Sequence, residues 1–118
     1  MINSILTSIK KMLGITEEYD AFDDDIIMHI NSVFLTLKQM GVGPSTGFRI
    51  DDAGETWENY IPTEDNPDNI ELLSAVKTYI HLKVKMLFDP PASAAITSSY
   101  EKQIAELEWR LNLEAESE

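Results

Sequence analysis

Cysteine is absent from this chain of 118 residues, which excludes disulfides, thiolate metal sites and thiol nucleophiles. Histidine is scarce too, because His29 and His81 are the only two and they fall on different predicted helices. Such a chain offers neither a zinc-ligand spacing nor a nucleophile with an adjacent base. No apolar run is long enough to span a bilayer, so we expect no membrane segment.

Basic residues are few: nine Lys and Arg stand against 21 Asp and Glu, for a net charge of −12. The summed field of this charge repels phosphate backbones and anionic lipid. We therefore do not expect sequence-specific DNA binding. The charge is instead consistent with a surface that DNA passes without adhering to it, or with binding to a basic partner. Residues 1–11 place their positive charge after a short, interrupted apolar pattern, the reverse of a signal peptide, so we expect cytosol-like surroundings.

Loops that hold phosphate or calcium are also missing. The stretch 41–44, Gly-Val-Gly-Pro, lacks the lysine and the following helix of a phosphate loop. The stretch 51–55 lacks the acid spacing and the closing glutamate of a calcium loop. We therefore expect no catalytic residues, no cofactor, no metal and no enzymatic activity.

What the sequence does contain is helical periodicity. Apolar spacing predicts four helices, at about residues 2–13, 23–40, 67–88 and 99–114, with Gly14 as the C-terminal cap of the first. The predicted fold is all-α, a single domain over residues 1–118 built as a small bundle. An irregular insert at about residues 41–66 is predicted to hold a short β-hairpin, with residues 48–50 and 56–60 flanking a turn.

The helix boundaries have local signals. Asp23-Asp24-Asp25 is interpreted as capping the second helix, with a metal site as the alternative. Asn66 and Pro67 begin the third helix, and Pro90-Pro91 ends it, because proline removes an amide donor and clashes with the preceding turn. Residues 98–101 match a capping box, which makes the last helix a separable arm.

The helix faces suggest where partners bind. The apolar arc of the third helix covers more than half its circumference, so we expect it to be surrounded, with its most buried face at Leu73, Val76, Ile80, Val84 and Leu87. Its polar strip, Lys77, His81 and Lys85, either complements the helix dipole or contacts an anion or partner.

Two apolar faces are predicted on the last helix. One is formed by Tyr100, Ile104, Leu107 and Leu111. Trp109 and Leu113 lie nearly opposite to it. They either fold back over a loop of the same subunit or contact another chain.

This order of elements, with its Leu87-Phe88-Asp89-Pro90-Pro91 break and a closing helix containing Glu108-Trp109-Arg110-Leu111, resembles the head-tail connector proteins of tailed bacteriophages, also called head-completion or adaptor proteins. The resemblance implies a ring of about a dozen copies below the portal protein. Such a ring extends the DNA channel and carries a head-tail stopper or tail completion protein. The implied location is the virion head-tail junction, after assembly in the cytoplasm of the bacterial host.

The resemblance also suggests contact residues. By analogy, portal or partner contact is expected at Trp109, Leu113 and Arg110, and subunit or lower-partner contact at Phe48, Trp57 and Tyr60. Two other functions stay open. One is an acidic helical regulator or nucleic-acid mimic that binds a basic partner protein. The other is a small hydrolase, which would need carboxylates converging in a pocket.

Overall fold

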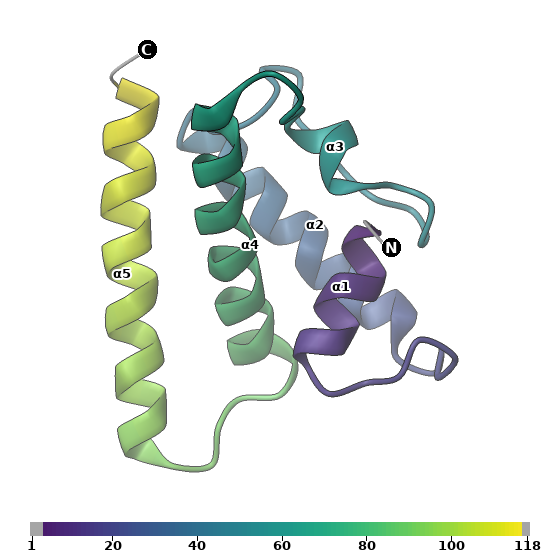
Figure 1. The fold of residues 1–118 in the computed structure, drawn as a ribbon. Coiled ribbons are helices and arrows are strands. Elements are labelled where there is room, and N and C mark those ends of the chain that lie inside the picture. The colour runs from purple at the N-terminus through teal and green to yellow at the C-terminus, as the bar shows by residue number, and fades with distance from the viewer. Residues whose placement is uncertain (1–3, 117–118) are drawn as a thin grey trace.

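A computed structural model of the protein describes residues 4–116, and these form five helices. They are α1 (Ile5–Met12), α2 (Asp23–Gln39), α3 (Trp57–Tyr60), α4 (Pro67–Phe88) and α5 (Ala94–Glu116). The all-α prediction is confirmed. Helix α4 lies between α2 on one side and α5 on the other, and α5 runs antiparallel to it (Figure 1). The third predicted helix is therefore surrounded, as its wide apolar arc indicated.

Helix α1 starts at a side-chain cap and ends at a glycine. Ser4 Oγ accepts a hydrogen bond from the Thr7 amide at 3.2 Å, and Gly14 follows the helix with φ 82°, as its predicted capping role requires. The side chains of Ile5, Leu6 and Ile9 are buried. Ile2, at the start of the predicted helix 2–13, lies outside the described residues.

The start of α2 differs from the prediction. The N-cap residue is Phe22, which makes no side-chain capping bond, so the three aspartates do not cap the helix. They occupy its first turn, where carboxylates still complement the positive end of the helix dipole. Asp23 makes an ion pair with the buried Lys10 from α1, at 2.8 Å between Oδ1 and Nζ.

The hairpin predicted in the insert is wrong. Residues 57–60 form α3, because Thr56 Oγ1 accepts from the Asn59 amide at 3.2 Å and Asn59 Oδ1 accepts from the Thr56 amide at 2.9 Å, a complete capping box. At the other expected strand, Ile50 donates its amide to Asn31 Oδ1 at 2.8 Å and its carbonyl accepts from Asn31 Nδ2 at 2.9 Å. A side chain thus satisfies the backbone that a partner strand would have paired.

The insert belongs to the hydrophobic core. Its buried side chains pack with those of α1, α2 and α4: they are Val42, Ile50, Trp57, Tyr60 and Ile61. Within residues 4–116 the backbone bridge outside the helices joins Ser4 to Thr56, and the Ile5 amide donates to the Glu55 carbonyl at 3.1 Å. The start of α1 is thereby fixed to the insert.

Helix α4 begins as predicted, with Asn66 accepting from the Asn69 amide at 3.3 Å and Pro67 in the first turn. Its predicted face is buried except at Leu87, which is exposed. In this last turn Phe88 packs against the core instead, because the rings of Phe22 and His29 lie beside it.

Helix α5 begins at Ala94, earlier than predicted, and the capping box at residues 98–101 is wrong. Ser93 Oγ accepts from the Ile96 amide at 3.4 Å, and the helix then starts with two alanines. Alanine has the highest helix propensity, which favours this earlier start, and the Ser93 side chain satisfies one of the free amides there. The chain between α4 and α5 is correspondingly short, residues 89–93.

Candidate interaction surfaces

One side of α5 faces the bundle and the other faces solvent. Leu111 is buried, and Ile104 and Leu107 are partly buried against the core. On the opposite side the side chains of Trp109 and Leu113 are 64% and 46% exposed. Trp109 does not fold back over a loop of its own chain. The two residues are therefore available to another molecule.

A partly buried hydrogen bond joins α5 to α4. The Tyr79 hydroxyl donates to Glu108 Oε2 at 2.8 Å, and burial, together with the Glu108 carboxylate, raises the pKa of Tyr79. Glu108 was not among the predicted contact residues, although a carboxylate between Leu107 and Leu111 on an inward face is a signal of such a bond. Arg110, a predicted contact residue, is ion-paired to Glu106 one turn earlier on the exposed side.

The aromatic residues of the insert are core residues. Trp57 is 2% exposed, and its Nε1 donates to Ser8 Oγ of α1 at 3.2 Å. Tyr60 is buried, with its ring centroid 4.7 Å from that of Phe34 and 5.2 Å from that of Phe48. In this conformation Trp57 and Tyr60 have no side-chain surface to offer a neighbour. Of the three predicted contact residues, only Phe48 is partly exposed.

The polar strip of α4 is partly buried, and each of its members has a partner in the chain. Lys77 Nζ lies 5.4 Å from the ring centroid of Trp57, and Lys85 Nζ lies 2.8 Å from Asp89 Oδ2. Burial lowers the pKa of His81, the charge of Lys85 lowers it further, and a hydrogen bond with the Met12 backbone opposes both effects. An anion contact at this strip stays a prediction.

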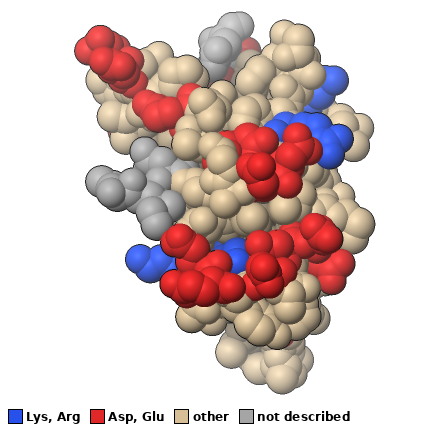
Figure 2. All heavy atoms as spheres, turned by 90° about the vertical axis from the view of Figure 1, so that its right-hand side faces the viewer, with Lys and Arg blue, Asp and Glu red and all other residues tan. Residues whose placement is uncertain are grey.

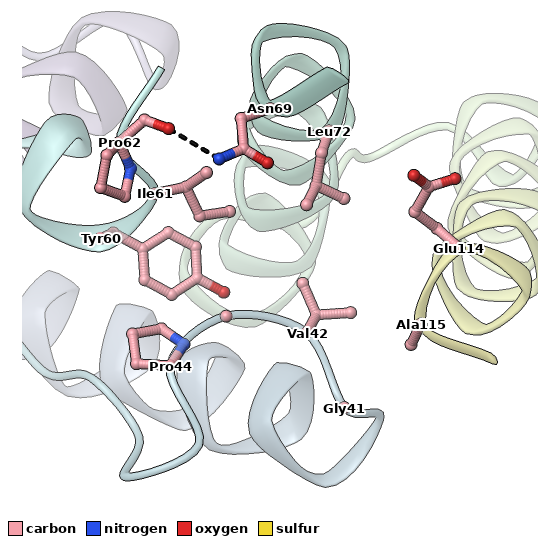
Figure 3. Close-up of a pocket in the computed structure, with 11 residues that line it drawn as sticks. Gly41, Val42, Pro44, Tyr60, Ile61, Pro62, Asn69, Leu72, Glu114 and Ala115 are labelled. Atoms are coloured by element: carbon pink, nitrogen blue, oxygen red, sulfur yellow. Dashed lines mark hydrogen bonds between the residues drawn. The ribbon is translucent and has the colours of Figure 1, made fainter. Parts of the chain in front are cut away.

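A cavity of about 270 Å³ opens where the insert, the start of α4 and the end of α5 meet (Figure 3). The Asn69 side chain on its wall donates to the Pro62 carbonyl at 2.7 Å, and Glu114 and Ala115 of α5 form its edge. The Tyr60 hydroxyl at the cavity has no hydrogen-bond partner among the described residues. Glu114 is the one carboxylate among the lining residues, so a pair of acids for hydrolysis is not assembled here.

Within residues 4–116, no three His, Cys, Asp or Glu side chains gather as a metal ion would require. None of the helices in that range is both long enough and apolar enough to cross a membrane.

Residues 5–118 match the family of proteins described as phage connector protein. The chain belongs to the phage connector family. No curated protein and no solved structure matches it. Membership makes this connector a structural protein of phage head-tail assembly.

The connector should lose stability in mild acid because of His81. Its pKa is lowered in the folded state, so the unfolded chain binds the proton more readily, and the stabilisation present above about pH 6.5 is lost as the pH falls. Between about pH 7.5 and pH 5, the melting temperature of the wild-type connector should therefore fall more than that of His81→Gln. Calorimetry across this range tests the difference, and parallel curves for the two proteins would contradict it.

Proposed function

We propose that the protein forms a ring at the phage head-tail junction, docks on the portal protein, extends the DNA channel and carries the next component, a stopper or tail completion protein. Assembly would take place in the bacterial host cytoplasm and end in the virion. Family membership supports the general assignment. The observation that carries the docking step is the pair Trp109 and Leu113, exposed on a helix whose other side is already satisfied by its own subunit.

Tryptophan is the residue type most enriched at energetic centres of protein interfaces, and Leu113 lies one turn further along the same exposed side. Arg110 lies between them in sequence and could exchange its Glu106 partner for a carboxylate of the portal. In a ring each subunit uses two different surfaces for its two neighbours. Docking through α5 leaves the surfaces of α1 and the insert for these contacts.

The proposed DNA channel agrees with the charge of the chain. A net charge of −12 repels phosphate backbones, so DNA does not adhere to the protein. The wall of a channel through which DNA slides needs this property. The portal contact is the part of the proposal to test first.

Replacing both docking residues, Trp109→Ala with Leu113→Ser, should weaken binding to the portal protein at least about tenfold, because a central aromatic anchor is lost. Both side chains are exposed, so the unfolding curve should change little. Binding is measured by titrating portal rings with connector and weighing the complexes by native mass spectrometry.

The matched control is Met28→Ser with Leu35→Ser, two exposed apolar residues of α2. This variant should bind the portal like the wild type. The docking proposal would be abandoned if the α5 variant bound normally, or if the α2 variant lost binding to the same extent. In the wild type, docking should also shift the emission of Trp109 to shorter wavelength, since its ring leaves water.

A further inference from the structure

Four aromatic rings touch in succession at the C-terminal end of α4. The ring centroids are 5.7 Å apart for Tyr19 and Phe22, 5.3 Å for Phe22 and Phe88, and 6.5 Å for Phe88 and His29, all edge to face. We call these four residues the aromatic patch. Tyr19 is 51% exposed and Phe22 41% exposed, while the other two are half-buried. Rings that hold one another in place lose little freedom when a ligand binds.

Carboxylates surround this patch in the sequence. Segment 17–25 contains six: Glu17, Glu18, Asp20, Asp23, Asp24 and Asp25. Among the described residues, Asp23 is the only one of these six carboxylates that makes an ion pair, and its partner is Lys10. Figure 2 faces the side on which this segment lies and shows Asp and Glu gathered in groups, with Lys and Arg in the minority. The aromatic patch therefore lies in a strongly negative field.

This field decides which ligand suits the patch. Nucleic acid and anionic lipid are repelled. A second copy of the chain brings little positive charge, because six of its nine cations already pair with carboxylates or lie over rings: Lys10, Arg49, Lys77, Lys83, Lys85 and Arg110. An arginine or lysine of another protein finds both ring faces and free carboxylates here.

We propose that the aromatic patch binds a basic segment of a different protein, one that presents arginine or lysine around an apolar side chain. The apolar side chain packs on Tyr19 and Phe22, and the cations lie among Glu18, Asp20 and Asp24. This site goes beyond portal docking through α5. Arg110 and Leu111 lie beside the start of α4, whereas Phe88 is its last residue, so the two surfaces are at opposite ends of that helix.

Three short synthetic peptides test the ligand chemistry on the full-length protein. One alternates Arg with Phe, one alternates Arg with Ser at the same charge, and one alternates Phe with Ser. By calorimetry, the Arg-Phe peptide should bind at least about tenfold tighter than either of the others, and its binding should weaken with added salt. Amide shifts in the NMR spectrum should concentrate in residues 17–29 and 85–89. Equal binding of the Arg-Ser peptide, or shifts elsewhere, would refute the site.

Surface variants then measure separately how much the aromatic rings and the carboxylates contribute to binding of the Arg-Phe peptide. Tyr19→Ser with Phe22→Ser, and separately Glu18→Gln with Asp20→Asn and Asp24→Asn, should each reduce affinity for the Arg-Phe peptide at least about tenfold. The charge control is Glu64→Gln with Glu71→Gln and Glu101→Gln, three exposed acids outside segment 17–25, and it should change affinity less than about twofold. A control that lost as much affinity as the first charge variant would overturn the proposal.

Two further outcomes distinguish the alternatives. If sedimentation shows self-association that disappears in the Tyr19→Ser, Phe22→Ser variant, the ligand is a second copy of this chain and the proposal fails. The Trp109→Ala, Leu113→Ser variant should bind the Arg-Phe peptide normally. The test of portal docking and the test of ligand binding at the aromatic patch therefore have independent outcomes.

Discussion

Replacing Trp57 with alanine is expected to lower the free energy of unfolding by about 3–5 kcal/mol, the usual cost of truncating a buried tryptophan. The ring is 2% exposed and is enclosed by the insert, α1 and α4. The substitution also removes the hydrogen bond to Ser8 and the ring beneath Lys77. Since domains of this size are stable by about 5–15 kcal/mol, the loss should be plain in chemical unfolding curves.

Trp109→Ala is the matched control for this experiment. It makes the same chemical change at the other tryptophan of the chain, which is exposed on α5. Its expected cost is less than about 0.5 kcal/mol, because the side chain gains little from folding. Similar losses at both positions would mean that the insert does not close the core as described.

Gly43→Ala is expected to lower the free energy of unfolding by about 2–4 kcal/mol, from two sources. The backbone at Gly43 has φ 87°, a region that side chains disfavour. A Cβ atom there would also lie 2.7 Å from both Cε1 and Oη of Tyr60. That ring cannot yield cheaply, because Phe34 and Phe48 pack against it.

Gly14→Ala measures the backbone cost without the contact with Tyr60. Its φ is 82°, almost the same as at Gly43, but no atom lies within 4 Å of the Cβ position. Only the backbone cost remains, about 1–2 kcal/mol. The difference between the two alanine variants in chemical unfolding therefore measures the contact with Tyr60. Equal losses would show that the Tyr60 ring moves aside.

The long helices could be predicted because their signals are local. Asn66 and Pro67 fix the start of α4, and its apolar period continues over several turns. The outward position of Trp109 followed from its place relative to Leu111 on a single helix, which needs no knowledge of the rest of the chain. The presence of each long helix was therefore predictable from its own segment, whereas the caps predicted at residues 23–25 and 98–101 were wrong.

The insert could not be predicted in the same way. Thr56 and the aromatic residues after it have high β-propensity, but the hydrogen bonds between Thr56 and Asn59 favour a helical turn. The Asn31 side chain binds the backbone of Ile50 across 19 residues of sequence. Long-range side-chain partners of this kind leave no periodic signal, so an irregular segment looked like a hairpin.

The aromatic patch was missed for a related reason. Tyr19 and Phe22 lie between the first two predicted helices, among acidic residues, and Phe88 is the last residue of the third predicted helix. Only the packing of α4 beside α2 brings these rings together. The neighbouring aspartates at residues 23–25 were interpreted by their place in the helix alone, which concealed their position beside exposed rings.

The bridge between Ser4 and Thr56 has a consequence for the order of folding. Helix α1 has eight residues, too few to be stable alone, and its tertiary partner Trp57 lies 49 residues beyond Ser8. Closing so long a loop costs entropy that only the finished contact repays. During synthesis α1 therefore completes its packing only after Trp57 has left the ribosome.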